Sequence, residues 1–481
     1  MAVTHASRDA GNRPSGSHLN TGEGPTLLPL DIGHPAYMGL VDPDTAFWAL
    51  VHKDRLADAL EGGELLTSFH QKRASFQEEM QTLRFGLQPS AVYFNPTDRC
   101  NLDCSYCYIP QTMRRHGTEM SREKLLEALR LLQGHFAKTL PPSRRPRVIF
   151  HGAEPLLNKE ALFAGIAAYN NEFDFGVQTN ATLLDGEAVD FLTSRGVSIG
   201  LSLDGIRAET THRTRKSWAG NLNVHAKVLE AMERLAGYPY YSVIVTVTRE
   251  NASELPQMVE FLHERQVPNC LLNMTRCTLP AAREVRLADE EAATPFIAAL
   301  ERSHELFRQS GRKLVVANFA NILLAILAPT ARRLMCDISP CGGGRAFFAL
   351  AANGDLFPCS EFIGLDSFRG GNLFAGGLDA ALTSPAFHRV TGRTVETIDP
   401  CRRCAIRHFC GSPCPAEAHE MNGGMDRPGA FCAFYEEQTR YAFRLIADGI
   451  ADDFLWDGWD DGVVTLFDKV GPLVTPEVSP P

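Results

Sequence analysis

The sequence predicts an α/β fold, with a parallel β-sheet covered by outer helices and followed by a cysteine-rich region. Short apolar segments recur six times between residues 91 and 274, and a stretch with helical spacing of apolar residues follows each. This alternation predicts strand–helix pairs whose sheet is either open or curled into a partial barrel. Eight of the 13 cysteines follow Arg333, which sets the C-terminal region apart.

Composition narrows the class of protein. The chain has 481 residues, and its 44% hydrophobic and 22% charged content is ordinary for a folded protein. At roughly 100–200 residues per domain, this length allows two to four domains. The net charge of −10 argues against a broad nucleic-acid surface, and no apolar run reaches the ~18 residues that span a bilayer. Residues 1–24 carry no apolar signal-peptide segment. We therefore expect a cytoplasmic enzyme with no nucleic-acid or membrane partner.

The N-terminal part predicts a tail and a small separate segment. Residues 1–26 are polar and predict a disordered tail. In segment 27–89, Tyr37–Val41 and Ala46–Val51 predict two strands around a turn at residues 42–45, and helices follow through Leu83. The segment either binds a peptide as a docking element or packs against the next domain as a lid.

Residues 90–312 carry the regular alternation that predicts the barrel. The expected strands are Ala91–Asn95, Arg147–Phe150, Phe175–Gln178, Val197–Leu201, Ser242–Thr248 and Cys270–Met274. The expected helices are Arg122–Phe136, Lys159–Asn170, Gly186–Arg195, Asn223–Leu235, Ala252–Glu264 and Asp289–Phe307. In parallel sheets of this kind, functional residues lie in loops beyond the carboxyl ends of the strands.

The pattern changes after residue 312. Residues 313–335 predict a connector, and 336–435 a cysteine-rich domain in which glycine pairs interrupt short segments. Apolar periodicity is weak there, so we expect metals or cross-links to supply much of its stability. Residues 436–481 predict the end of a helix spanning Phe431–Asp448 and an exposed acidic tail from Asp452 to Pro481.

Three cysteines lie in the loop after the first barrel strand. Cys100, Cys104 and Cys107 have the spacing C-x3-C-x2-C. Three thiolates on a short loop can hold three corners of a four-iron, four-sulfur cluster, leaving one iron open. Zinc is the competing interpretation, but a structural zinc site normally needs a fourth ligand from elsewhere.

This loop resembles the C-x3-C-x-aromatic-C motif of the radical S-adenosylmethionine (radical SAM) superfamily, with Tyr106 as the aromatic residue. Further resemblances follow the next strands at His151–Pro155, Gln178–Thr182, Ser202–Gly205 and His212–Arg215. Ala153 departs from the second glycine of the family's Gly-Gly-Glu-Pro element. The resemblance implies a partial (β/α)6 TIM-like barrel and these cofactor-binding residues: Tyr106, Gly152, Ala153, Glu154, Thr179, Asn180, Ser202, Asp204, and Arg213 or Arg215.

The resemblance also implies the chemistry. The open iron of the cluster chelates S-adenosyl-L-methionine, and one electron cleaves it to methionine and a 5′-deoxyadenosyl radical. That radical abstracts a hydrogen atom from the substrate. An electron donor such as flavodoxin or ferredoxin is then a required partner. The protein contributes positioning and exclusion of water.

The C-terminal cysteines resemble the seven-cysteine pattern of the SPASM domain, with an eighth from Cys336. Spacing alone leaves tandem zinc sites open, because C-x2-C pairs also suit zinc. The family's arrangement implies two further [4Fe-4S] clusters, three in all. One auxiliary cluster takes Cys336, Cys341, Cys359 and Cys414, and the other takes Cys401, Cys404, Cys410 and Cys432. Cys270 and Cys277 remain as ordinary core residues.

SPASM enzymes modify peptides or proteins, so we expect an oxidoreductase that forms a thioether or carbon–carbon cross-link in a ribosomally synthesised peptide with a leader segment. In sulfatase maturases, an Asp directly follows the cysteine that corresponds to Cys359, whereas Ser360 and Glu361 follow here. Glu361 is the candidate catalytic base. The alternatives are oxidation of a protein Ser or Cys to formylglycine, peptide epimerisation or decarboxylation, and a non-catalytic iron-sulfur or zinc-binding protein.

Overall fold

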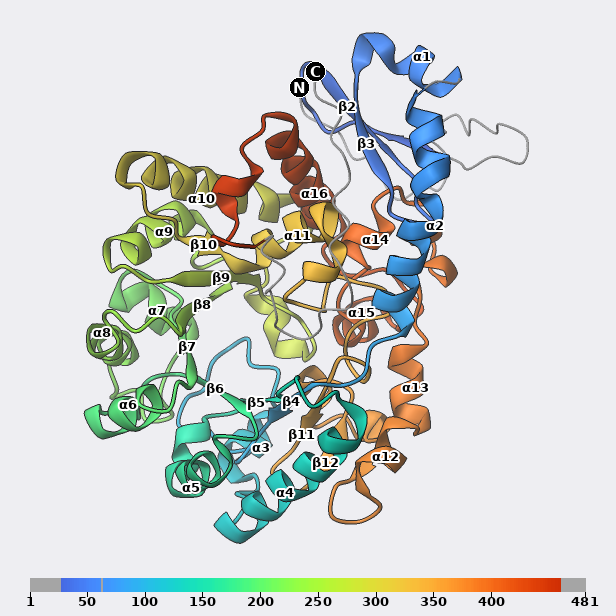
Figure 1. The fold of residues 1–481 in the computed structure, drawn as a ribbon. Coiled ribbons are helices and arrows are strands. Elements are labelled where there is room, and N and C mark those ends of the chain that lie inside the picture. Colours follow the sequence, from blue (N-terminus) through green and yellow to red (C-terminus); the bar gives the residue numbers. More distant parts are fainter. Residues whose placement is uncertain (1–26, 62–63, 460–481) are drawn as a thin grey trace.

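The computed structural model describes residues 27–61 and 64–459, which form two β-sheets and their surrounding helices (Figure 1). The expected N-terminal tail, residues 1–26, and the end of the expected acidic tail lie outside the described residues. Among the described residues, no helix combines the length and apolar character needed to cross a membrane.

The larger sheet contains the six expected parallel strands as neighbours in chain order. They are β4 (Ala91–Phe94), β5 (Arg147–Phe150), β6 (Asp174–Thr179), β7 (Ser198–Ser202), β8 (Tyr241–Val247) and β9 (Asn269–Met274). Each pairs in parallel with the next. The predicted strands are confirmed, because short apolar runs suit strands that are buried on both faces. All six carboxyl ends therefore meet at one edge of the sheet.

Helices cover the outer side of this curved sheet (Figure 1). They are α4 (Arg122–Thr139), α5 (Lys159–Tyr169), α6 (Gly186–Thr193), α8 (Val224–Arg234), α9 (Leu255–Glu264) and α10 (Asp289–Ser310). The side chains of Ser121, Asp185 and Asn223 accept backbone N–H bonds at the starts of α4, α6 and α8. The curved α/β arrangement confirms the partial-barrel prediction.

The sheet continues beyond the six strands at both sides. At one side, β10 (Val315–Val316) pairs in parallel with β9 and leads into the buried helix α11 (Ala317–Leu327). At the other, β11 (Phe347–Leu350) pairs in parallel with β4 and is followed by β12 (Asp355–Phe357) and β13 (Gly371–Asn372). The cysteine-rich region therefore extends the barrel sheet.

Although apolar periodicity is weak in its sequence, this region also contains buried apolar side chains. All four residues of β11 are buried, and a second core cluster includes Phe357, Phe362 and Phe368. The remaining helices here are α12 (Gly377–Leu382), α13 (Pro385–Thr391), α14 (Arg407–Cys410), α15 (Pro415–Asn422) and α16 (Cys432–Ala447). Helix α16 confirms the helix predicted near Phe431–Asp448. The exposed tail begins later than predicted, because Phe454 and Leu455 are buried in the core.

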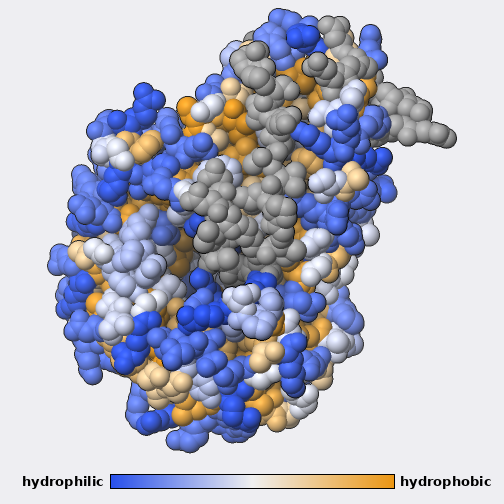
Figure 2. Space-filling model, in the orientation of Figure 1, coloured by the Kyte–Doolittle hydropathy of each residue, from blue (hydrophilic) through white to orange (hydrophobic). Residues whose placement is uncertain are grey.

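The N-terminal unit is a small antiparallel sheet followed by helices. Strands β1 (Leu28–Leu30), β2 (Tyr37–Val41) and β3 (Trp48–His52) lie in that order, and α1 (Leu56–Glu61) and α2 (Glu64–Phe85) follow. The predicted strands and turn are confirmed. Trp48 anchors the unit, since its buried indole N–H donates to the Ile326 carbonyl of α11 at 2.8 Å. The face of the whole molecule that Figure 2 shows is largely hydrophilic outside the grey residues.

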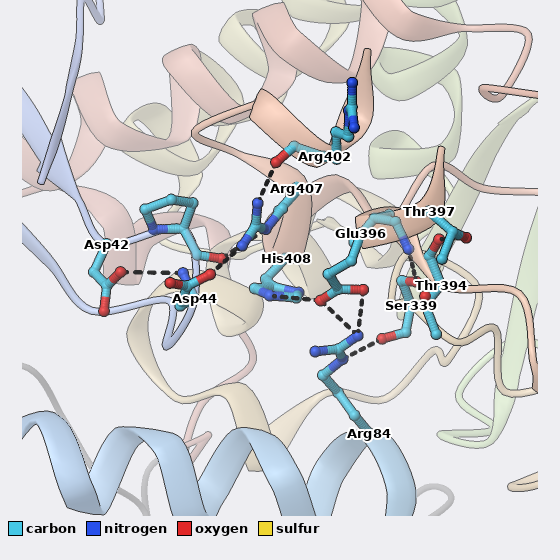
Figure 3. Close-up of polar contacts among 12 residues, drawn as sticks. Asp42, Asp44, Arg84, Ser339, Thr394, Glu396, Thr397, Arg402, Arg407 and His408 are labelled. Carbon is cyan, nitrogen blue, oxygen red and sulfur yellow. Dashed lines mark hydrogen bonds and ion pairs between the residues drawn. The ribbon is translucent and has the colours of Figure 1, made fainter. Parts of the chain in front are cut away.

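Buried charges attach the N-terminal unit to the cysteine-rich region (Figure 3). Arg84, near the end of α2, donates from Nε to the Ser339 carbonyl at 2.5 Å and pairs with Glu396 at 2.9 Å. Arg407 of α14 pairs with Asp44 in the turn before β3. These contacts attach the unit to α11 and to the cysteine-rich region, whereas one of the two sequence interpretations has it packing against the domain that follows it in the chain.

Candidate functional site

The loop that carries the first three cysteines connects β4 to α3 (Gln111–His116) and is held by hydrogen bonds to its backbone and to Asp103. Arg114 of α3 donates from Nε to the Ile109 carbonyl at 3.0 Å and from Nη1 to Asp103 Oδ1 at 2.8 Å. The Cys100 amide donates to the Arg114 carbonyl at 2.9 Å, and the Trp218 indole donates to the Cys100 carbonyl at 2.7 Å. The backbone of the loop is therefore set independently of any bound group.

The three thiols of this loop share one electrostatic environment. All three residues are half-buried. Burial raises the pKa of Cys104 to about 11, and burial also raises the pKa of Cys107. For Cys100, burial and then the charge of Cys104 raise the pKa. Thiolates gathered in such a place need a compensating cation. This donor set therefore fits an iron cluster.

The turn after β5 is joined to the turn after β6 through Glu154. This fully buried carboxylate accepts the Thr179 hydroxyl at 2.8 Å, the Asn180 amide at 2.8 Å and the Leu156 amide at 3.1 Å. Burial raises its pKa to about 6, and these hydrogen bonds oppose the rise. Two motifs that lie apart in the sequence thus form one polar assembly.

Gly152 and Ala153, which precede this carboxylate, are half-buried. Gly152 has φ +103°, and a Cβ atom there would lie 2.2 Å from Cγ of Asn95. A side chain is therefore excluded at this position both by backbone conformation and by space. Ala153 follows Gly152 in the same turn, and the methyl group of Ala153 leaves the requirement for glycine at position 152 unchanged.

A second polar assembly joins the cysteine loop to the end of β7. Tyr106 donates its hydroxyl to Asp204, and Arg215 donates from Nε to Asp204 Oδ2 at 3.2 Å and to the Tyr106 hydroxyl at 3.1 Å. Asp204 also accepts the Thr246 amide of β8 at 3.0 Å. Ser202, the last residue of β7, is half-buried nearby in the chain.

The two candidate arginines have different environments. Arg213, in α7 (Ala208–Thr214), has a 57% exposed side chain and pairs with Glu250 at 3.4 Å. Arg215 has an 8% exposed side chain, and its Nη1 atom is buried without a hydrogen-bond partner among the described residues. Nearby, Ser105 Oγ and Thr214 Oγ1 are also buried and unpaired within the described part of the chain. These orphaned polar atoms fit a polar, anionic group beside the cysteine loop.

The C-terminal cysteines fall into two neighbourhoods. Burial raises the pKa of Cys336, and the charges of Cys341 and Cys414 raise it further. Cys359 has Cys341 and Cys336 among the charges that raise its pKa, after burial and Glu361. The first four cysteines that the SPASM resemblance groups together are therefore neighbours in the structure.

The second neighbourhood has the other four members. Burial, followed by the charges of Cys432, Cys404 and Cys401, raises the pKa of Cys410. Burial and then Cys404 raise the pKa of Cys432 to about 12. All 13 cysteines are free thiols. Cys270 and Cys277 are both 0% exposed and pack in the core.

Glu361 lies between the two cysteine regions. It is half-buried, and its Oε2 accepts the Thr278 hydroxyl at 3.2 Å. Burial raises its pKa to about 6, opposed chiefly by the charge of Arg276. Its own charge raises the pKa of Cys107 and that of Cys359, after burial in both cases. The carboxylate of Glu361 therefore interacts with a thiol of the first loop and with a thiol of the C-terminal region.

Arg276 is a further residue of this region, and none of the sequence motifs includes it. This half-buried residue follows β9, at the same edge of the sheet as the cysteine loop. Its pKa is raised, because the charges of Cys414, Tyr435 and Cys336 outweigh the effect of burial. Its position just beyond the carboxyl end of a strand was the available sequence signal.

Comparison with known proteins identifies the family. Residues 94–262 match the model of the radical SAM superfamily. The chain is 41% identical over 407 residues to an uncharacterised protein of Archaeoglobus fulgidus, covering 85% of this chain and 92% of that one. It is 22% identical to a cysteine-type anaerobic sulfatase-maturating enzyme of Clostridium perfringens, covering 75% and 98% of the two chains. It is 26% identical to a PqqA peptide cyclase of Bradyrhizobium diazoefficiens, covering 79% and 96%.

Solved structures share the fold. One is the enzyme anSMEcpe with bound AdoMet and the Cp18Cys peptide, with a TM-score of 0.66, 20% identity, and coverage of 76% of this chain and 99% of that one. Another is Streptococcus suis SuiB bound to its precursor peptide SuiA, with a TM-score of 0.53, 13% identity, and coverage of 83% and 98%. With its cysteine loop, its barrel and these relatives, the chain belongs to the radical SAM superfamily and is an enzyme of the SPASM type.

Proposed function

We propose that this enzyme binds S-adenosyl-L-methionine at the Cys100–Cys107 loop and forms a thioether or carbon–carbon cross-link in a ribosomally synthesised peptide. The observation that carries the proposal is the convergence of two polar assemblies at this loop, one centred on Glu154 and one on Arg215. Both lie at the carboxyl edge of the parallel strands, where α/β barrels place their active sites.

Cys100, Cys104 and Cys107 hold the [4Fe-4S] cluster that binds S-adenosylmethionine. When bound, this pair of groups supplies a 5′-deoxyadenosyl radical that abstracts hydrogen from the substrate. The protein's own task is to position the cofactor and exclude water. The hydrogen bonds from Arg114 and Trp218 to the loop fix its backbone and so help to position the cofactor.

Each polar assembly has a separate binding role. Arg215, with its unpaired Nη1 atom, binds the carboxylate of the cofactor, and Arg213 stays at the surface with Glu250. Glu154 and the turn around Gly152 and Ala153 receive the amino group of the methionine moiety, since a buried carboxylate favours a cation. Tyr106 and Asp204 hold Arg215 in place. Thr179, Asn180 and Ser202 complete the cofactor pocket.

Eight cysteines hold two auxiliary clusters, in the sets defined by the two neighbourhoods. Full ligation by four thiolates leaves no open iron, which suits electron transfer rather than substrate binding. Held by these cysteines, such clusters would supply an acceptor for the one electron that a net two-electron oxidation, such as cross-link formation, leaves after hydrogen abstraction. An external donor of the flavodoxin or ferredoxin type supplies the electron that starts the reaction.

The relatives' names support a peptide substrate, and the residues after Cys359 favour a cross-link over formylglycine. A peptide cyclase and a sulfatase-maturating enzyme match most of this chain. Here Ser360 directly follows Cys359, and Glu361 is displaced by one position. Glu361 nevertheless acts electrostatically on both Cys107 and Cys359, and we assign it the role of base.

The N-terminal unit, residues 27–89, supplies a surface for the leader segment of the peptide. Strand β3 lies at the edge of the three-stranded sheet, so within the described residues its outer backbone groups have no strand partner. An extended peptide can add to such an edge as a further strand. The rest of the chain keeps the division expected from its sequence. The barrel comprises residues 90–312, the connector 313–335, the auxiliary-cluster domain 336–435, and the C-terminal helix and acidic tail 436–481.

The decisive experiment uses the full chain, reconstituted anaerobically with iron and sulfide. Reduced enzyme and S-adenosylmethionine are incubated with each small peptide encoded beside its gene, and deoxyadenosine and peptide mass are measured. The proposal requires deoxyadenosine and a peptide lighter by two hydrogen atoms. Cys104→Ala should abolish both, whereas Cys270→Ala should retain both.

Other outcomes select the alternatives. Zinc without iron, or no deoxyadenosine after reduction, indicates a non-catalytic binding protein. Deoxyadenosine with an aldehyde product indicates formylglycine formation, and an unchanged mass with altered stereochemistry indicates epimerisation. An unchanged peptide in every neighbouring candidate overturns the cross-linking proposal.

A further inference from the structure

Arg393 is a buried cation whose hydrogen bonds all go to neutral oxygen atoms. It follows α13, is 7% exposed, and donates from Nε to the Met425 carbonyl at 2.5 Å. Its Nη1 donates to the Ser412 carbonyl at 2.8 Å, and its Nη2 donates to Ser412 Oγ at 3.1 Å and to the Arg427 carbonyl at 2.9 Å. Within the described residues, no ion pair joins Arg393 to a carboxylate.

A buried charge without a counter-ion is costly, so the anions near Arg393 matter. They are four cysteines, in order of influence Cys341, Cys414, Cys401 and Cys410, whose thiolate forms oppose the lowering of the arginine's pKa by burial. The first two belong to one cysteine neighbourhood and the last two belong to the other. The guanidinium therefore lies between the two sets.

Ser412, to which Arg393 donates two hydrogen bonds, also connects the two sets of cysteines. Ser412 lies two positions after Cys410 and two before Cys414, one member of each set. The Ser412 side chain hydrogen-bonds the Cys401 thiol, and the Ser412 backbone hydrogen-bonds the Cys410 thiol.

Ser412 is held in a conformation that needs support. Its φ is +49°, an uncommon value for a residue with a side chain. Arg393 binds both its carbonyl and its hydroxyl, and the Gly429 amide adds a bond to the hydroxyl at 2.9 Å. The arginine thus fixes the turn from which both cysteine sets diverge.

We propose that Arg393 is a positioning residue shared by the two auxiliary clusters, and that its charge raises the reduction potential of both. The inference rests on the proposed ligation of two clusters by eight cysteines. Reduction adds one negative charge to a cluster, and a fixed cation in a poorly solvated site lowers the energy of that state. One arginine placed between two clusters favours the arrival of an electron at either of them.

Arg345 provides a matched control. It too is buried, and it donates only to carbonyls, among them Pro340 and Cys341 at 3.1 Å and Leu83 at 2.9 Å. Among the described residues, the cysteine whose charge counts among the largest effects on the pKa of Arg345 is Cys341, of the first set. Its removal tests the effect of losing a buried arginine that faces one set alone.

The test is an anaerobic redox titration of the full reconstituted chain, followed by electron paramagnetic resonance, for the wild type, Arg393→Gln, Arg393→Lys and Arg345→Gln. Arg393→Gln should lower both auxiliary potentials by at least ~59 mV, a tenfold change for a one-electron couple. Arg393→Lys keeps the charge and should restore both potentials. Arg345→Gln should affect no more than one auxiliary cluster.

Unchanged potentials in an iron-replete Arg393→Gln variant would overturn the inference, as would equal losses in the Gln and Lys variants. If Arg393→Gln fails to retain iron, Arg393→Lys decides: wild-type potentials support the charge effect, and lowered potentials refute it. Failure of the proposed ligation looks different, because the wild type itself would then hold fewer than two auxiliary clusters by iron analysis.

Discussion

Nε of Arg215 lies 3.2 Å from Oδ2 of Asp204, and both side chains are almost completely buried. The remaining Nη1 of Arg215 is buried without a partner among the described residues, so the ion pair orients the guanidinium and leaves one nitrogen available. This relationship distinguishes Arg215 from Arg213, which is separated from it by one residue and faces solvent.

Replacing Arg215 with Gln should weaken the binding of S-adenosylmethionine by about 10–100-fold, because a hydrogen bond to a charged group contributes about 1.5–3 kcal/mol. Equilibrium binding to the reconstituted enzyme measures this change. Arg213→Gln is the control and should leave the dissociation constant within about twofold, since its pair with Glu250 is largely exposed. Equal effects of the two substitutions would contradict the assignment.

Replacing Glu361 with Gln should separate cofactor cleavage from peptide modification. The amide keeps the size of the side chain but removes the base, so the peptide product should fall by about 10²–10⁴-fold while deoxyadenosine still forms. Chromatography and mass spectrometry measure the two products in one reaction. Glu420→Gln, which alters a peripheral pair with Arg283, should change neither. A Glu361→Gln enzyme with full product yield would remove this residue from the mechanism.

Glu79 should make stability depend on pH. This carboxyl in α2 is 9% exposed, and burial raises its pKa from the ordinary 4.5 to about 7. Between these values the folded protein binds more protons than the unfolded chain, so this contribution is complete below pH 4.5 and is lost as pH rises through about 7.

Between pH 5.5 and pH 8.5, the part of this contribution that is lost should amount to roughly 2 kcal/mol. Anaerobic urea unfolding of the wild type and Glu79→Gln, at pH 5.5 and pH 8.5, measures it. The variant keeps the shape of the side chain without its charge, so its free energy of unfolding should fall less between these two conditions. Identical pH dependence in both proteins would show that Glu79 does not titrate in this range.

Arg84 should contribute to holding the N-terminal unit on the cysteine-rich region. Arg84→Met leaves Ser339 O and Glu396 without this donor and should lower the free energy of unfolding by about 1.5–3 kcal/mol. Arg402→Met is the control from the same network (Figure 3), since its exposed pair with Asp399 should matter by about 0–1 kcal/mol. Anaerobic urea unfolding measures both changes, and equal sensitivity of the two variants would argue against the attachment.

Much of the fold was predictable because local patterns determine it. The six barrel strands lie within one or two residues of their predicted positions, since apolar runs bounded by polar turns define buried parallel strands. The pairing of β11 with β4 was not predictable, because it joins segments about 250 residues apart in the sequence. An apolar segment of four residues does not indicate which strand it will pair with.

The candidate site divides in the same way. The sequence by itself determined the cysteine spacing and the motifs that follow successive strands, and these indicate the radical SAM superfamily. They suffice because the carboxyl ends of neighbouring parallel strands meet at one edge of the sheet, whatever the connections between them. Only the tertiary structure separated Arg215 from Arg213 and placed Arg276 and Glu361 near the C-terminal cysteines. It also set Arg393 between the two cysteine sets. Burial and partner choice decide these roles, and both arise from contacts between segments that are distant in the sequence.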